Sequence, residues 1–475
     1  MEFITNTLTS MDDFLWGVPL IVLILSAGVF LTIRLRGVQI IHLPLALKYM
    51  VKNEEGGSGE VSSFAALCTA LSATIGTGNI VGVATAVGVL AGGPGALFWM
   101  WVAAFFGMAT KYTEGFLAIK YRTINEKGHV LGGPFYYIEH GMGEQWRWLA
   151  KLFAFFGACV GLFGIGTFTQ VNGIASAMQG FFDPEKTNTV MILGREYSIV
   201  IVITAFVLTL VVGLVTLGGI KRIAAVSEIV VPFMAAIYII SALILILANI
   251  NKVPGAFLDI IQGAFGVKPV AGGMFASIAI AMQKGVARGI FSNEAGLGSA
   301  PIAAAAAQTK SPVRQGLVTM TGTFIDTIIV CTMTGFSIIM MGSWKEKNLE
   351  GVQVTTDAFK KGLYFMPEKA AASILVFCLV FFAFTTILGW DYYGERCLEY
   401  LTNGNMKVVS VYKWLYILAV FIGPYMTVSL VWTVADIFNG LMAIPNIIAL
   451  FALSGIVAKE TKDYLSKLRN EKKNI

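Results

Sequence analysis

The chain of 475 residues is 56% hydrophobic and only 13% charged, whereas soluble globular proteins carry roughly a quarter charged residues. This composition excludes an ordinary soluble protein and indicates a polytopic membrane protein. The net charge of +6 does not indicate a nucleic-acid partner, because the excess lysine and arginine lies in loops and in the C-terminal tail, where membrane topology accounts for it.

Apolar runs of about 20 residues, each long enough for a membrane-spanning helix, recur along the chain. We expect eleven spans, of which two are broken. They cover residues 14–34, 61–90, 94–121, 149–180, 198–217, 223–249, 257–290, 313–342, 369–389, 410–430 and 433–457. The predicted fold class is therefore an all-α polytopic membrane protein with a single transmembrane domain over residues 1–475.

Lysine and arginine gather in alternate loops and in the tail 458–475. The positive-inside rule makes these loops and the C-terminus cytoplasmic, and the odd number of spans places the N-terminus outside. The loop 343–368 contradicts this topology mildly, because it carries four lysines on the outer side, although its acids partly balance them.

The second span contains two glycines around a threonine, followed by an asparagine: Gly76, Thr77, Gly78 and Asn79. Each glycine weakens an α-helix by up to about 1 kcal/mol relative to alanine. Within lipid, a broken helix is tolerated only where protein or a watery cavity surrounds the freed backbone groups. Glycines also serve close helix packing, but the added asparagine and threonines favour a break that holds a small zwitterion and a cation.

The two half-helices at this break suit opposite charges. A helix that begins near Thr77 presents free N–H groups to a carboxylate, and we assign that role to Thr77, Gly78 and Asn79, next to Gly76. The half-helix that ends near Ile75 presents oxygens to a cation. We assign that role to Ser72, Thr74 and Ile75.

Five spans separate the starts of the second and seventh spans, which begin on opposite sides of the membrane. We therefore expect residues 61–249 and 257–457 to form an inverted repeat after the extra N-terminal helix 14–34. The second half should contain its own break, and both 271–277 and 292–299 fit. A break at 292–299 would leave Lys284 and Arg288 in the outer half of the membrane, whereas a break at 271–277 would bring them near the cytoplasmic interface, where long cations can snorkel.

We prefer 271–277 for the substrate and interpret 292–299 as a cytoplasmic turn or gate. The carbonyls of the preferred break suit an ammonium group, and Phe275 can close over a small side chain. The alternative is a flexible loop that enters the seventh span. The candidate substrate-binding residues here are Gly273, Met274, Phe275, Ala276 and Ser277.

Four polar residues in other spans are further candidates. Gln170 can donate to a substrate or bond across helices. Thr385 and Thr386 can complete a sodium site with Ser72 and Ile75, or bond only to their own helix. Asp326 is a carboxylate in mid-span, which is a functional hypothesis by default; it can balance a cation together with Asn79, or pair elsewhere in the bundle.

Three motifs resemble the alanine/glycine:cation symporter family, which is also called the sodium:alanine symporter family. They are Gly-Thr-Gly-Asn-Ile-Val-Gly-Val-Ala at 76–84, Gly-Gly-Pro-Gly-Ala-Leu-Phe-Trp-Met-Trp at 92–101 and Arg-Gly-Ile-Phe-Ser-Asn-Glu-Ala-Gly-Leu-Gly-Ser-Ala-Pro-Ile at 288–302. The resemblance implies a LeuT-type fold with an extra N-terminal helix. It also implies one sodium site at Ser72, Ile75, Thr385 and Thr386, and a second to which Thr74 and Asn79 contribute. One departure is the run of alanines at 303–307, where many members carry a histidine.

The resemblance implies a sodium-coupled symporter in the cell membrane that imports alanine or glycine, with Na⁺ as transported co-substrate and no organic cofactor. Its expected partners are the amino acid and membrane lipid. The alternatives are a sodium- or proton-coupled carrier of a larger amino acid or a nucleobase and, less favoured, a channel. An enzyme is not expected, because the spans contain no nucleophile with its base and no His/Asp/Glu cluster.

Overall fold

The computed structural model describes residues 2–52, 54, 56–124, 129–192, 194–266, 274–426 and 428–473. The helices before residue 190 are α1 (Glu2–Leu15), α2 (Val18–Arg34), α3 (Val38–Ile41), α4 (Leu43–Val51), α5 (Ser63–Thr74), α6 (Val83–Val87), α7 (Gly95–Lys120), α8 (Pro134–Tyr136), α9 (Arg147–Phe163) and α10 (Phe168–Phe182). The later helices are α11 (Ile199–Thr216), α12 (Gly219–Ala248), α13 (Val253–Ala264), α14 (Met274–Asn293), α15 (Ala300–Ala305), α16 (Pro312–Thr323), α17 (Thr332–Met341), α18 (Val352–Gly362), α19 (Glu368–Leu401), α20 (Met406–Ile422) and α21 (Val428–Lys473). Two small hairpins pair β1 (Thr123–Ile124) with β2 (Val130–Leu131) and β3 (Thr189–Ile192) with β4 (Arg195–Ser198).

Helices long and apolar enough to cross a membrane make up most of the described chain. There are eight, or nine when the bent pair Ser63–Thr74 and Gly78–Val87 counts as one span. An all-helical polytopic membrane protein is thus confirmed. The two remaining predicted spans, 94–121 and 257–290, are helical in their described parts, as α7 and as α13 with α14, but these helices are not among those long and apolar enough to cross a membrane.

Polar residues at the starts of several spans explain where the helices begin. Ser62 accepts a hydrogen bond from the N–H of Ala65 at the start of α5, at 3.0 Å. Ser311 does the same for Arg314 at the start of α16, at 3.4 Å. Such caps satisfy backbone donors that the first helical turn leaves free.

The central helix is α7, in which every residue from 107 to 119 is buried. It packs along α14 and α16 and also contacts α2 and α15. Small residues allow this close packing: an added methyl group at Gly107 would come within 2.8 Å of the side chain of Ala295. The segment around 295 therefore lies in the protein interior.

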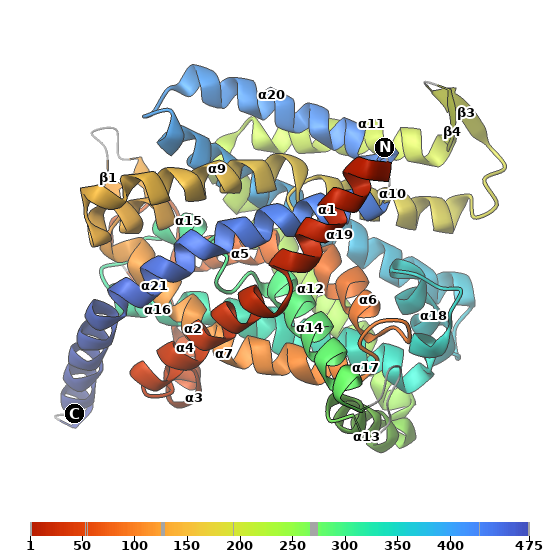
Figure 1. Cartoon of the computed structure of the whole chain (residues 1–475), viewed down its shortest axis with the longest axis horizontal. Coiled ribbons are helices and arrows are strands. Elements are labelled where there is room, and N and C mark those ends of the chain that lie inside the picture. The colour runs from red at the N-terminus through yellow and green to blue at the C-terminus, as the bar shows by residue number, and fades with distance from the viewer. Residues whose placement is uncertain are drawn as a thin grey trace.

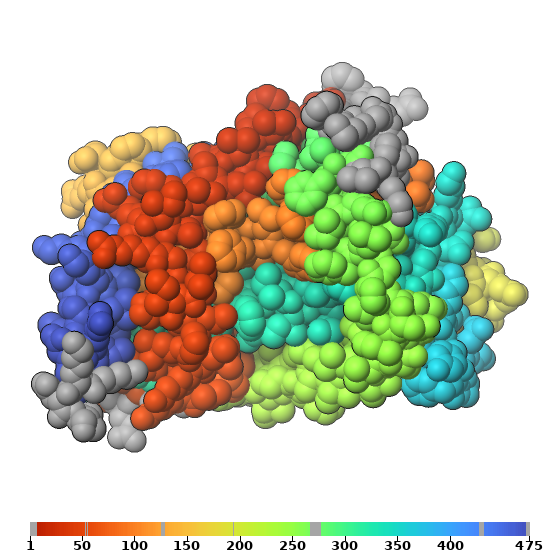
Figure 2. Space-filling model, turned by 90° about the horizontal axis from the view of Figure 1, so that it is seen from below, coloured from red at the N-terminus to blue at the C-terminus, as the bar shows by residue number. Residues whose placement is uncertain are grey.

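The connections gather at two opposite ends of the molecule. One end carries β1, α3, α4 and the C-terminus, and the other carries α18 and the β3–β4 hairpin (Figure 1). The C-terminal part of α21 lies beside the segment that contains α3 and α4, as both views show (Figures 1 and 2). The loops predicted to share one side of the membrane therefore lie together.

Candidate functional site

The second predicted span is broken where the sequence indicates. Helix α5 and the helical residues Gly78–Val87 meet at 51° around residues 75–77. The first turn after the break, Gly78–Gly82, is π-helical. Every residue from 65 to 80 is buried, so the backbone groups freed by the break need partners inside the protein.

Two amide side chains supply partners for the freed N–H groups. The N–H of Gly76 donates to Oδ1 of Asn79 at 2.9 Å, and the N–H of Thr77 donates to Oε1 of Gln170 at 3.0 Å. The Thr77 hydroxyl oxygen is buried and has no hydrogen-bond partner among the described residues. Asn79 and Gln170, both chosen from the sequence, thus lie at the break, whereas Asn172 donates to the carbonyl of Met426 at 3.0 Å.

A second break lies between Asn293, the last residue of α14, and Ala300, the first of α15. Three residues within it have positive φ: Glu294 at 56°, Gly296 at 91° and Gly298 at 81°. Glycine adopts this region freely, but a glutamate does so at a cost. Every residue from 290 to 307 is buried.

The stretch 292–299, which we interpreted as a cytoplasmic turn or gate, is thus a break that is buried inside the protein. The choice between the two stretches assumed that Lys284 and Arg288 must lie near the membrane surface, but Arg288 has a partner inside the protein. Its guanidinium lies 2.9 Å from the carboxylate of Asp436 and 5.0 Å from the ring of Trp432. A paired and stacked cation does not need to reach the interface by snorkelling.

The described residues include only part of the alternative that we preferred, 271–277. Gly273 lies outside the described residues, as do the side chains of Met274, Phe275 and Ala276. From Met274 onward the backbone is the start of α14, and Ser277 is buried.

Asp326 joins the two breaks. It is buried in a π-helical stretch, Phe324–Cys331. One carboxylate oxygen accepts from Nδ2 of Asn79 at 2.7 Å, in the first break. The other accepts from the hydroxyl of Ser292 at 2.9 Å, at the end of α14, and from Thr327 at 2.7 Å. An added methyl group at Gly78 would lie 3.2 Å from Cα of Ser292, so the two breaks are in close approach.

Two of the oxygen atoms chosen as cation ligands lie close together at the end of α5. The hydroxyl of Thr386 lies 3.3 Å from the carbonyl oxygen of Ile75 and donates to Phe382 O of its own helix at 3.0 Å. The other candidate hydroxyls also donate to carbonyls of their own helices: Ser72 to Thr69 at 2.7 Å, Thr74 to Ala70 at 3.2 Å and Thr385 to Phe382 at 3.0 Å. A hydroxyl that donates its proton to the backbone keeps its lone pairs free to face a cation.

A cavity of about 1550 Å³ leads to this region. Thr77 and Gly173 line it at the break, and Arg288 and Trp432 line it farther out. It extends to Trp344 and to residues of α18, at one end of the molecule (Figure 1). A small polar solute can therefore reach the break from the α18 end.

Two buried breaks joined by one carboxylate, beneath a deep cavity, are typical of a membrane transporter. The chain matches the sodium:alanine symporter family over residues 1–475. It is 46% identical to a sodium/alanine symporter, AgcS, of Methanococcus maripaludis, over the full length of both chains.

The chain belongs to the sodium:alanine symporter family.

Other relatives extend over most of the chain. An uncharacterised transporter of Haemophilus influenzae is 54% identical and covers 98% of this chain and 97% of its own. A probable sodium/glutamine symporter, GlnT, of Bacillus subtilis is 37% identical and covers 95% of this chain and 89% of its own. The protein is thus a transporter, not an enzyme, and the predicted family is confirmed.

One buried carboxylate of this transporter was missed by the sequence analysis. Glu114, in the middle of the molecule on α7, accepts hydrogen bonds from the N–H groups of Gly296 and Gly298, at 3.1 and 3.2 Å, and from Nδ2 of Asn446 at 2.7 Å. It thereby holds the second break in place. The sequence feature that pointed to Glu114 was Lys111, which lies one helical turn earlier and is also buried. Opposite charges three residues apart share one face of a helix.

The acidic residues near the ends of the predicted spans differ in burial. Glu228 is exposed. The others are buried inside the protein, namely Glu114, Asp391, Glu395 and Asp436. Partners on distant helices explain the difference for two of them: Lys413 lies 2.8 Å from Glu395, and Arg288 pairs with Asp436.

Proposed function

We propose that the protein is a sodium-coupled symporter that imports small neutral amino acids, alanine or glycine, by alternating access. The observation that carries this proposal is the junction of the two breaks at Asp326, where backbone groups, a carboxylate and hydroxyl oxygens converge. Membership of the sodium:alanine symporter family supports it, as does the similarity to the Methanococcus maripaludis sodium/alanine symporter.

The amino acid's carboxylate is proposed to bind at the start of the helix Gly78–Val87, where free N–H groups attract an anion. It would replace Oε1 of Gln170 on the N–H of Thr77. The ammonium group is proposed to bind carbonyls at the end of α14, next to Ser292. This revises the assignment to residues 273–277, because the end of α14 is the part of the second half that approaches Gly78.

Sodium is proposed to bind between α5 and α19, with the carbonyl of Ile75 and the hydroxyls of Ser72, Thr385 and Thr386 as ligands. Oxygen atoms at the C-terminal end of a half-helix suit a hard cation. Asn79, Thr74 and Asp326 are the candidates for a second cation. Each charge that moves inward through about 100 mV supplies about 2.3 kcal/mol, which can drive uphill uptake of a neutral zwitterion.

Replacing Thr386 with valine should weaken the response to sodium. Valine keeps the shape but removes the oxygen that faces Ile75, and losing one ligand worth about 1.4 kcal/mol raises the half-saturating sodium concentration about tenfold. Alanine uptake measured against sodium concentration in proteoliposomes tests this. The matched control is Thr209→Val, because the Thr209 hydroxyl, like that of Thr386, donates to a carbonyl of its own helix, that of Ala205 at 2.7 Å, but lies on α11. An equal shift in both variants would contradict the sodium site.

The topology is part of the same proposal. We place the N-terminus outside and the C-terminus in the cytoplasm, so that the large cavity faces outward. The segments 61–249 and 257–457 are proposed to be inverted repeats of a LeuT-type fold after the extra helix 14–34. In support, each contains a buried break, and the next long helix after each broken helix, α7 in the first segment and α16 in the second, packs against the other.

The test of the function is uptake by the purified protein in proteoliposomes with an inward sodium gradient. Labelled alanine should accumulate only with the gradient, and unlabelled alanine or glycine should compete. Leucine, glutamine and uracil should compete poorly. If glutamine competes and alanine does not, the assigned substrate is wrong, and if uptake proceeds equally without sodium, the assigned coupling is wrong.

A further inference from the structure

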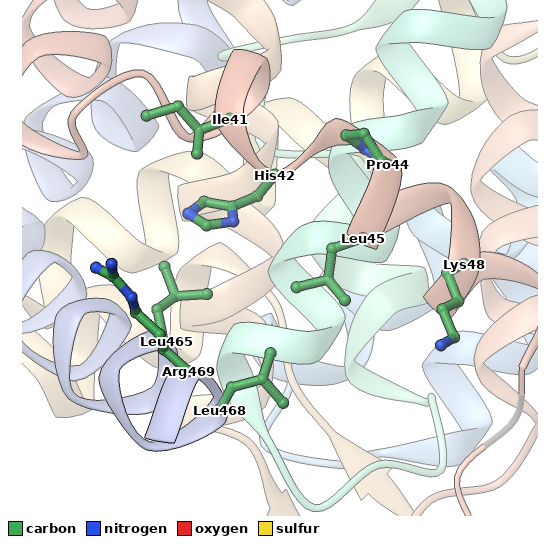
Figure 3. Close-up of a pocket in the computed structure, with 8 residues that line it drawn as sticks. All are labelled: Ile41, His42, Pro44, Leu45, Lys48, Leu465, Leu468 and Arg469. Atoms are coloured by element: carbon green, nitrogen blue, oxygen red, sulfur yellow. The ribbon is translucent and has the colours of Figure 1, made fainter. Parts of the chain in front are cut away.

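A groove of about 370 Å³ lies far from the transport site, between the segment 41–48 and the C-terminal part of α21 (Figure 3). Its apolar lining comes from both segments and consists of Ile41, Pro44, Leu45, Leu465 and Leu468. Three basic side chains complete it: His42, Lys48 and Arg469. In Figure 3 the leucines lie between Lys48 and Arg469, so the groove has an apolar floor with a cation toward either side.

Two other cations at this end of the molecule have carboxylate partners. Lys120 lies 2.6 Å from Glu460, and Arg314 lies 3.8 Å from Glu54. Over the described part of the chain, neither Lys48 nor Arg469 forms an ion pair with a carboxylate. Their charge is therefore available to an anion from outside the chain.

The third basic residue, His42, adds polarity rather than charge. Burial lowers the pKa of His42 below its ordinary value of 6.5, so its ring is neutral at pH 7. A neutral imidazole still donates one hydrogen bond. The groove thus has two fixed positive charges and one neutral donor.

The surroundings of the groove place it at the membrane surface. Ile40 and Ile41 are 62% and 63% exposed, and Val51 is 70% exposed. Short helices with exposed apolar residues beside cations are typical of the boundary between acyl chains and headgroups. The hydroxyls of Tyr49 and Tyr464 lie 3.1 Å apart and hold α4 against α21, so the groove is preformed.

We propose that this groove binds an anionic phospholipid, with its phosphate between Lys48 and Arg469 and the upper part of an acyl chain on the leucine floor. Charge complementarity selects an anionic headgroup, and the apolar floor selects a lipid over a free anion. Basic pockets between helices on the cytoplasmic side of membrane proteins recognise such headgroups. The site is independent of the proposed transport function, because none of its residues lines the transport cavity.

Native mass spectrometry of the purified full-length chain in detergent tests the proposal. The protein is titrated with dioleoylphosphatidylglycerol and, separately, with dioleoylphosphatidylcholine, which has the same acyl chains and no net charge. The double variant Lys48→Gln/Arg469→Gln should bind phosphatidylglycerol about 25-fold more weakly, at about fivefold for each cation near the headgroup. The matched control is Lys462→Gln/Lys467→Gln, which removes the same charge from exposed positions on the same helix and should change binding less than twofold.

The proposal is overturned by any of three results. Equal weakening in both double variants would mean that general surface charge attracts the lipid. Equal binding of the two lipids by the unmodified chain would mean that the headgroup charge is not recognised. Displacement of phosphatidylglycerol by millimolar inorganic phosphate would mean that the groove holds a small anion rather than a lipid.

Discussion

Replacing Gly76 with alanine is expected to reduce amino-acid uptake strongly. The added methyl group would lie 2.5 Å from the hydroxyl oxygen of Thr386 and 2.9 Å from Oε1 of Gln170, both far inside normal contact. One of the two side chains must move, and both belong to the proposed site. Overpacking of this kind costs about 1–3 kcal/mol, so we expect uptake of labelled alanine in proteoliposomes to fall about a hundredfold.

The chain offers a matched control for this substitution. Gly82 lies in the turn that follows the same break, and an added methyl group there would meet nothing within 4 Å. The Gly82→Ala variant should therefore transport within twofold of the unmodified protein. Size-exclusion chromatography of both variants would establish that they are folded. Normal uptake by Gly76→Ala would mean that the close approach of Gly76, Thr386 and Gln170 plays no part in transport.

The first break was predictable from sequence because its signal is local. Two glycines within three residues, with Asn79 beside them, interrupt an otherwise apolar run. Asn79 itself then satisfies the N–H of Gly76. A sequence pattern of this kind needs no knowledge of distant contacts, since the residues that break the helix also supply one of the missing partners.

The second break was not predictable by the same reasoning, because two stretches rich in glycine competed for it. The argument that chose between them assumed that Arg288 lacked a partner. Asp436, which pairs with it, is 148 residues away in the sequence. Likewise Glu114, which holds Gly296 and Gly298, belongs to a helix 182 residues from Gly296. Contacts at such separations leave no periodic or local signal.

Asp326 was predictable as a candidate because a carboxylate in mid-span is rare and costly, but its role depends on the fold. It accepts from three donors, one in the first break, one at the end of α14 and one on its own helix. It therefore fixes the relative position of the two half-sites while carrying a negative charge. We infer that Asp326 supports the geometry of the site and balances the charge of the cation.

Replacing Asp326 with asparagine separates these roles and should have the other large effect. Asparagine keeps the shape, but it accepts through one oxygen only. Its NH₂ group would therefore face either the Asn79 NH₂, donor against donor, or the hydroxyls of Ser292 and Thr327, whose protons would then lose their acceptor. A buried donor left without an acceptor costs about 1–3 kcal/mol, and the negative charge near the cation is lost as well. We expect sodium-driven alanine uptake to fall at least about a hundredfold, with the half-saturating sodium concentration raised.

The control for Asp326→Asn is Thr327→Val, which removes one of the three donors to the carboxylate and leaves its charge in place. If the negative charge of Asp326 is decisive, uptake by Thr327→Val should fall about tenfold or less, because one hydrogen bond contributes about 1.5 kcal/mol. Its sodium dependence should be unchanged. If both variants lose uptake equally with unchanged sodium dependence, Asp326 acts only by positioning the two breaks. Full sodium-driven uptake by Asp326→Asn would instead mean that this carboxylate is not part of the transport site. It would also mean that the two breaks do not work as one unit through Asp326.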